Sequence, residues 1–157
     1  MRLFDTHAHL NMKPLRAQVD SVVERAAGAG VEHIICVGTD LASSRVAIEL
    51  ARRFSDRVLA AVGIHPTATA RVSDGALDEL ERMAGRPDVV AVGETGLDYH
   101  HDDSPPEVQQ DFFAEHLELA RRVEKPVIIH ARKADEDTLD VLDSVGTPVM
   151  GLSSWNR

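Results

Sequence analysis

Five short apolar runs, each followed by a stretch with helical periodicity, constrain the fold of this chain more than any other feature. They recur roughly every 25 to 35 residues, the spacing of successive βα units, and a sixth run begins after them. Near-continuous apolar strands that alternate with amphipathic helices are typical of a parallel sheet buried on both faces. The pattern therefore predicts an α/β fold with about five βα units and the start of a sixth strand. The six runs are 3–4, 33–38, 58–64, 89–93, 126–129 and 147–150.

The first run leads directly into two histidines that an extended chain would turn to the same side. His7 and His9 are separated by one residue, and alternate side chains of a strand share a face. Two imidazoles placed in this way can share a metal ion; the alternative is a pair of surface histidines. Asp5 shares their face but lies deeper in the strand, where we expect it to orient a ligand.

Metal-capable side chains also follow three of the later runs. His65 follows the third run, Glu94 the fourth and His130 the fifth. Because ligands of parallel α/β folds collect at the carboxyl ends of the strands, we expect these residues to lie near His7 and His9. Imidazoles and a carboxylate suit zinc or manganese, and the two oxygens of Glu94 could bridge two ions. The alternatives are a capped strand end for His130 and a structural ion pair for Glu94.

Four residues, His65 among them, are candidates for supporting roles. His65 suits a substrate phosphate or a water better than a metal, although a structural turn histidine is the alternative. Arg132, two residues after His130, is either a phosphate contact or a solvated arginine. We expect Asp98 to accept backbone hydrogen bonds and so hold the segment around Glu94. For His116, in the middle of a helical stretch, we expect packing or a satisfied hydrogen bond.

Composition limits the partners and the compartment. The formal net charge of -9 argues against a broad basic surface that would neutralise nucleic-acid phosphates, but it leaves nucleic acid open as the substrate of a metal site. Cys36 is the only cysteine, so we expect a reducing compartment and no disulfide. The sequence shows no signal peptide or apolar run of membrane length. We expect a cytoplasmic protein with no membrane association and no obligate protein partner.

Four motifs, in order along the chain, resemble the TatD family of metal-dependent hydrolases. They span 5–10, 62–66, 93–99 and 126–132, and the resemblance extends from the first residue to about position 150. It implies a (β/α)₈ barrel of the TIM-barrel and amidohydrolase type, with two divalent ions (Mg, Mn or Zn) at the carboxyl ends of the strands. Family members are typically described as deoxyribonucleases, so the implied partner is DNA or another phosphodiester substrate.

The resemblance also implies a role for each candidate ligand. His7 and His9 would bind the first metal ion, Glu94 would bridge both ions, and His130 would bind the second. For a phosphodiesterase with such a site, we expect Glu94 and His65 to be the catalytic residues and His65 together with Arg132 to hold the substrate phosphate.

The chain departs from the family pattern in its length. A complete barrel of this type needs roughly 250 residues, and this sequence has 157. The family pattern also includes a histidine after the sixth strand and an aspartate at the eighth; segment 151–157 contains neither. We interpret 1–150 as the N-terminal part of a barrel and 151–157 as a tail outside the resemblance, as a frameshift or premature stop would produce.

Three functions stay open on this sequence. The first is a TatD-type phosphodiesterase, and the second is a catalytically inactive fragment that retains a partial metal site. The third is an amidohydrolase that acts on C–N or carboxylic ester bonds.

Overall fold

The computed structural model describes residues 2–146. Within them, five parallel strands form one sheet in the order β1-β2-β3-β4-β5. This confirms the predicted five βα units. The predicted sixth strand, 147–150, and the predicted tail, 151–157, lie outside the described residues. The strands are β1 Leu3–Ala8, β2 Val31–Val37, β3 Val58–Val62, β4 Val89–Asp98 and β5 Val127–Arg132.

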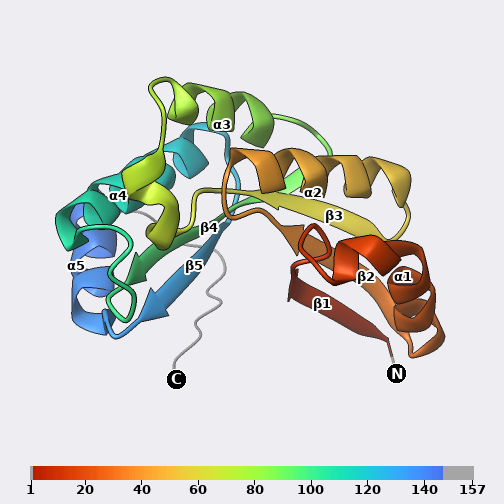
Figure 1. Cartoon of the computed structure of the whole chain (residues 1–157). Coiled ribbons are helices and arrows are strands. Elements are labelled where there is room, and N and C mark those ends of the chain that lie inside the picture. Colours follow the sequence, from red (N-terminus) through yellow and green to blue (C-terminus); the bar gives the residue numbers. More distant parts are fainter. Residues whose placement is uncertain (1, 147–157) are drawn as a thin grey trace.

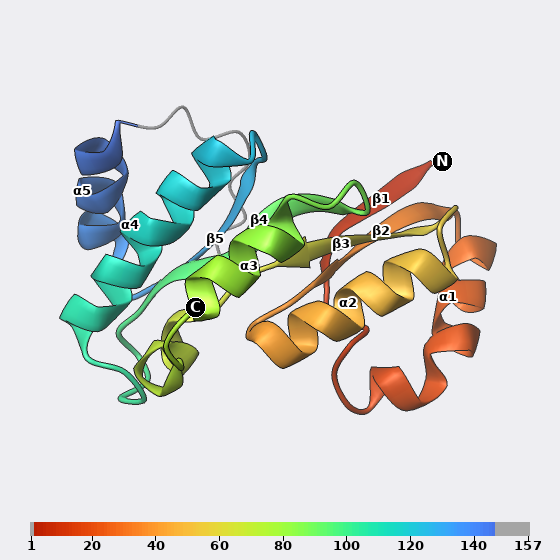
Figure 2. The same cartoon turned by 90° about the horizontal axis from the view of Figure 1, so that it is seen from above.

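The helices lie along one side of this sheet. In Figure 1 they follow its curve from α1 through α2 and α3 to α4 and α5, and Figure 2 shows the same helices from above. The sheet and its outer helices together form half of a (β/α) barrel. The helices are α1 Val19–Gly28, α2 Leu41–Arg53, α3 Ala76–Ala84, α4 Pro106–Arg122 and α5 Asp135–Val145, with short 3-10 helices η1 Leu15–Gln18 and η2 Pro66–Arg71.

Burial differs between the middle of the sheet and its first strand. Strand β3 is buried on both faces, with Val62 toward the helices and Ala61 in a small apolar cluster on the opposite face. Strand β1 departs from the prediction, because Leu3 is 39% and Phe4 is 50% exposed. It is an edge strand of the described sheet, and each large apolar side chain left outside the core forgoes about 1.5–3 kcal/mol.

Strands β4 and β5 are longer than their apolar runs predict. Pairing continues to Asp98 and Arg132, so Glu94 and His130 lie inside strands and not after them. Gly96 permits this extension, because its φ is +130° and a Cβ there would lie 2.1 Å from the His130 carbonyl oxygen. A second close approach occurs upstream, where a Cβ on Gly63 would lie 2.5 Å from the Gly93 carbonyl carbon.

The turn after β2 has a local cause in the sequence. Asp40 begins α2 with a capping box, in which its carboxylate accepts from the Ser43 N–H (2.6 Å) and the Ser43 hydroxyl accepts from the Asp40 N–H (3.0 Å). A capping box satisfies two backbone donors at the helix start. It fixes the point at which the chain leaves the sheet beside the candidate site.

Candidate metal centre

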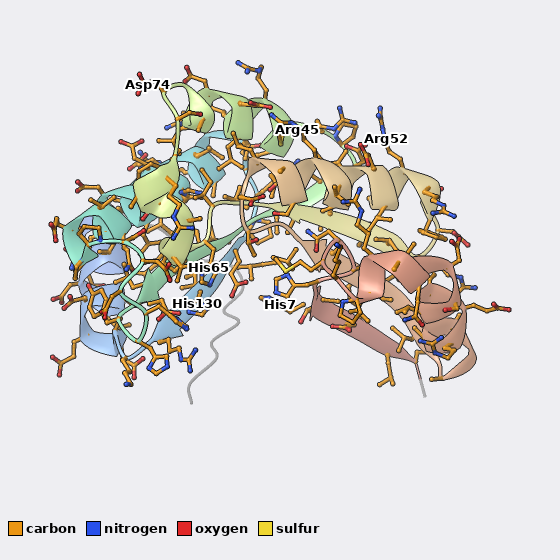
Figure 3. All side chains as sticks on the ribbon, in the orientation of Figure 1. His7, Arg45, Arg52, His65, Asp74 and His130 are labelled. Atoms are coloured by element: carbon orange, nitrogen blue, oxygen red, sulfur yellow. The ribbon has the colours of Figure 1, made fainter. Side chains whose placement is uncertain are left out.

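The carboxylate of Glu94 lies between histidines that come from the two edges of the described sheet, at β1 and β5. Its Oε2 is 3.3 Å from His7 Nε2 and 3.6 Å from His9 Nε2. Its Oε1 is 3.0 Å from His130 Nδ1. Figure 3 shows His7, His65 and His130 near one another, on the side of the sheet that faces away from α2 and α3. Each oxygen of one buried carboxylate thus faces a different histidine group.

The donors on the first side of Glu94 are spaced as a metal ion requires. His7 Nε2 and His9 Nε2 are 3.3 Å apart, and both are at a similar distance from the Glu94 oxygen. Donor atoms roughly 3.4 Å apart would surround a zinc-sized ion tetrahedrally at ligand distances of about 2.1 Å. The His9 Nδ1–H donates to the Val37 carbonyl (3.1 Å), which leaves the lone pair of Nε2 free to face the cluster. The three donors therefore fit a divalent cation.

Asp98 contacts His130 through its side chain, a role that the sequence analysis missed. Its Oδ2 is 2.9 Å from His130 Nε2. Both partners of the ring are carboxylates, which only accept, so without a metal ion both ring nitrogens donate, Nε2–H to Asp98 and Nδ1–H to Glu94. A metal ion would take the place of the Nδ1 proton while Asp98 keeps the Nε2–H, as in a carboxylate–histidine–metal arrangement. Asp98 also accepts the backbone N–H groups of His100 and His101, which confirms the predicted backbone role. The missed signal was spacing, because Asp98 follows Glu94 by four residues and so shares its face in an extended strand.

His65 lies close enough to Asp98 and His130 for the three to form a second cation-binding group. Its hydrogen bonds favour another role. The Nδ1 of His65 accepts from the Thr67 N–H (3.3 Å) and is 2.8 Å from the Thr67 hydroxyl. Burial, together with the neighbouring His130, lowers the pKa of His65 to about 4. The ring is therefore neutral with its proton on Nε2, which suits it to donate a hydrogen bond and not to bind a metal ion.

The charges of the site are set by opposing effects. Burial alone would raise the pKa of Glu94, but hydrogen bonds with His130 and His7 outweigh it and hold that pKa well below its usual range. For His130, burial would lower the pKa, while Glu94 and Asp98 raise it more. Glu94 is therefore a carboxylate at neutral pH, and its surroundings favour positive charge next to it.

Two other candidates lie at the margin of this cluster. Arg132 is the last residue of β5 and is partly buried. It lies two residues after His130, so the two side chains point to the same face of the strand. Its charge lowers the pKa of exposed His100, so it adds positive potential to that margin. The carboxylate of Asp5 is exposed and accepts the backbone N–H of His7 (3.1 Å). The carboxylate of Asp5 therefore contacts the backbone of the candidate ligand His7, whereas the sequence predicts that it orients a ligand.

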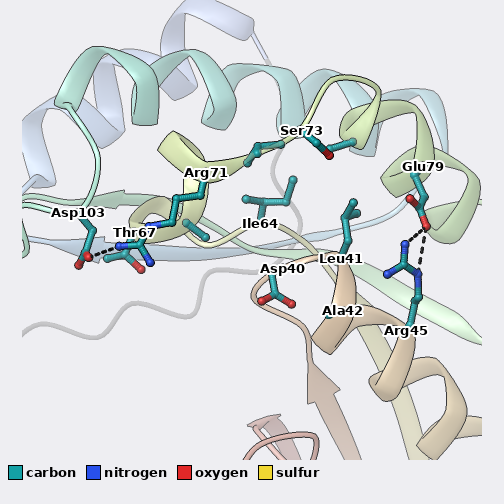
Figure 4. Close-up of a pocket in the computed structure, with 13 residues that line it drawn as sticks. Asp40, Leu41, Ala42, Arg45, Ile64, Thr67, Arg71, Ser73, Glu79 and Asp103 are labelled. Carbon is teal, nitrogen blue, oxygen red and sulfur yellow. Dashed lines mark hydrogen bonds and ion pairs between the residues drawn. The ribbon is translucent and has the colours of Figure 1, made fainter.

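A pocket of about 590 Å³ lies behind the His65 turn, between the start of α2, η2 and α3. Ile64 and Thr67 line it from that turn. As Figure 4 shows, ion pairs cross its two ends, Arg71–Asp103 (2.9 Å) and Arg45–Glu79. Both guanidinium groups are thus compensated, so the pocket is not a strong anion site.

A parallel half-barrel with imidazoles and carboxylates gathered at the carboxyl ends of its strands defines the class of barrel proteins built around a metal centre. The sequence profile described as "TatD related DNase" matches residues 4–152. The chain therefore belongs to the TatD family of metal-dependent hydrolases.

Relatives extend this finding over nearly the whole chain. The uncharacterized metal-dependent hydrolase TatD of Mycobacterium tuberculosis is 44% identical over 153 residues, which cover 93% of this chain and 58% of that protein. The 3'-5' ssDNA/RNA exonuclease TatD of Salmonella typhimurium is 34% identical, covering 90% and 54%. The chain thus spans between half and three fifths of the length of these relatives.

A solved structure agrees with the sequence relatives. The crystal structure of YjjV, a TatD homolog from Escherichia coli, superposes with a TM-score of 0.87 at 35% identity, covering 97% of this chain and 61% of that one. The expected barrel family is confirmed by this similarity. In the described part of the chain, no helix has the length and apolar character needed to cross a membrane.

Proposed function

We propose that this chain supplies His7, His9, Glu94 and His130 to a two-metal centre that hydrolyses phosphodiester bonds, with DNA as the expected substrate. The observation that supports this most directly is the placement of Glu94, whose two oxygens face separate imidazole groups. Bridging carboxylates need this geometry. The Salmonella relative is described as an exonuclease of single-stranded DNA and RNA, which favours a nucleic-acid substrate.

Each residue has a role that its contacts support. His7 and His9 would hold one ion, His130 the other, and Glu94 both. Divalent ions there (Mg²⁺, Mn²⁺ or Zn²⁺) would activate a water and offset the charge that develops at phosphorus. As a catalytic group, His65 would donate its Nε2–H to a phosphate oxygen, because its Nδ1 is already occupied by Thr67.

Arg132 would hold the same phosphate from the end of β5. A guanidinium group can donate two parallel hydrogen bonds to phosphate oxygens. It would thus fix the orientation of the substrate phosphate that His65 also contacts.

A second candidate function is metal binding without turnover. Among residues 2–146, the first side of Glu94 has two histidine donors in the cluster and the second has His130, whose other ring nitrogen is held by Asp98. Catalytic zinc sites usually provide three protein ligands for each ion. The second ion would then be held weakly, and hydrolysis would need further donors.

The deciding experiment compares metal binding and cleavage in one preparation. The chain is titrated with Mn²⁺ by calorimetry and then given labelled single- and double-stranded DNA, beside His7→Ala/His9→Ala and the exposed-histidine control His100→Ala. Cleavage that only the double variant loses supports the phosphodiesterase. Binding without cleavage supports the half-site. Cleavage of amide or carboxylic ester substrates but not of DNA contradicts the first proposal and favours an amidohydrolase.

Two further expectations remain proposals. The boundary between 1–150 and 151–157 depends on residues outside the described part of the chain. For location, we propose the cytoplasm, because Cys36 is buried and burial raises the pKa of its thiol to about 11. An unpaired, unreactive thiol fits a reducing compartment.

A further inference from the structure

Helix α4 carries two buried polar side chains on the face that contacts the sheet. Gln109 is 1% exposed and His116 is fully buried. They are seven residues apart, close to two helical turns, so they share a face. A buried polar group costs stability unless it is hydrogen-bonded. Both side chains are bonded, and both bond the backbone of a strand end that carries part of the candidate metal centre.

Gln109 holds the main chain of Asp98. Its Oε1 accepts from the Asp98 N–H (2.8 Å), and its Nε2 donates to the carbonyls of Asp98 (3.1 Å) and Ser104 (2.8 Å). The Gln109 amide therefore holds both the backbone N–H and the backbone carbonyl of Asp98, whose carboxylate contacts His130 (2.9 Å). Movement of Asp98 would rotate or release the His130 imidazole.

His116 acts in the same way on the end of β3. Its Nε2 accepts from the Ile64 N–H (3.1 Å), and its Nδ1–H donates to the Phe112 carbonyl. Ile64 directly precedes His65. Burial lowers the pKa of His116 to about 4, so the ring stays neutral and can accept this bond at neutral pH.

We infer that Gln109 and His116 are positioning residues, through which α4 sets the places of His65 and, by way of Asp98, of the His130 imidazole. The inference rests on the proposed metal centre. His7 and His9 depend on β1 and on the Val37 carbonyl, so α4 acts on one side of Glu94 only. Loss of a direct contact to a ligand, such as that of Asp98 with His130, typically weakens metal affinity about 10- to 100-fold, and the loss of Gln109 acts through that contact.

The test compares Gln109→Met with Leu117→Ala, a fully buried apolar position on the same helix. Mn²⁺ titration should show one class of ion weakened about 10- to 100-fold in Gln109→Met and the other unchanged. Leu117→Ala should lower the unfolding temperature and leave both affinities unchanged. Equal weakening of both classes in Gln109→Met, or no weakening, would overturn the inference. Gln109→Glu keeps the acceptor for Asp98 and replaces Gln109→Met if the latter does not fold.

A metal-free readout separates this inference from the proposed function. Nuclear magnetic resonance of the ring nitrogens should show a protected Nε2–H on His130 in the native chain and its loss in Gln109→Met. His116→Leu should speed amide exchange at Ile64, His65 and Thr67, because the Ile64 N–H loses its acceptor, and leave β1 unchanged. If the native chain binds no Mn²⁺, the proposed function fails, while these two signals still decide the roles of Gln109 and His116. Unchanged signals in both variants contradict them.

Discussion

The two sides of Glu94 are supported in different ways. On one side, His7 lies in β1 and His9 directly follows it; β1 is an edge strand of the described sheet, and its Phe4 is half exposed. On the other, His130 is fixed by Asp98, and Asp98 by Gln109. The first side depends on the pairing of β1 and on one hydrogen bond from His9 to the Val37 carbonyl, and the second on a chain of buried hydrogen bonds. Local openings are easiest where few contacts are buried, so the β1 side is expected to open first.

The largest expected effect comes from closing the space between β4 and β5. Gly96→Ala would place a methyl group 2.1 Å from the His130 carbonyl at a φ of +130°. Overpacking and backbone strain each cost about 1–3 kcal/mol, so we expect a loss of about 3 kcal/mol or more in urea unfolding. At the other end of the molecule, Gly28→Ala in α1 meets nothing within 4 Å and should be neutral or slightly stabilising. Equal losses would abolish the contrast between the two ends.

Acid should act on the α4 side through His116. Its pKa is about 4 when folded and near 6.5 when unfolded, so between these values the unfolded chain binds more protons and stability falls as pH falls. At 1.36 kcal/mol per pH unit, the loss approaches roughly 3 kcal/mol at pH 4. His116→Gln, which cannot titrate, should reduce the slope of the urea-midpoint profile between pH 6.5 and 4, while His65, whose pKa is also lowered to about 4, keeps its own share of that slope. A slope unchanged from that of the native chain would exclude His116 as the cause.

Removal of candidate ligands tests the β1 side. His7→Ala/His9→Ala should abolish one class of Mn²⁺ binding, with an affinity loss of about 100-fold or more, equivalent to about 2.7 kcal/mol. His130→Ala should weaken the other class. Chelation with EDTA should lower the unfolding temperature of the native chain, and it should lower that of the double variant by a smaller amount. Identical titrations for the two variants would mean that Glu94 does not divide two sites.

The smallest effect is expected at an exposed ion pair on the β1 side. Arg53 Nη2 of α2 is 2.6 Å from Asp20 Oδ1 of α1, and both side chains are more than half exposed. Such pairs contribute about 0.2–1 kcal/mol and weaken with salt. Arg53→Ala should therefore change the urea midpoint only slightly, and less so in 1 M NaCl. A loss as large as that of Gly96→Ala would show that surface charge, and not burial, holds this end.

The sequence predicted the presence of the strands and of the side-chain cluster better than it predicted the residues at which the strands end. Apolar runs locate the buried middle of each strand, so the five βα units and the meeting of His7 with Glu94 could be expected. Apolar runs do not predict where a strand ends if it continues with polar residues, as β4 does from Glu94 to Asp98, because that extension depends on pairing with β5. Exposure of Phe4 depends on which strands lie beside β1, and the Phe4 sequence context carries no such information.

Gln109 shows a second limit of sequence reasoning. Its partners, Asp98 and Ser104, are recognisable only once the helix is packed. The available signal was a glutamine four residues before Phe113 and seven before His116, which places it on the core-facing side of a helix. A polar residue on that side predicts a buried hydrogen bond, but it does not identify the partner.

The close approach of Gly63 to Gly93 affects how variation in this fold should be interpreted. Any side chain at position 63 would overlap the backbone of β4 at 2.5 Å, so saturation mutagenesis should reject nearly every substitution there, as strictly as at His7. A measurement of tolerance to substitution alone would therefore not distinguish Gly63, which has no chemical role, from the candidate metal ligands. Assays that record folding and metal uptake separately would distinguish them, because the glycine variant loses both while the histidine variant loses only the ion.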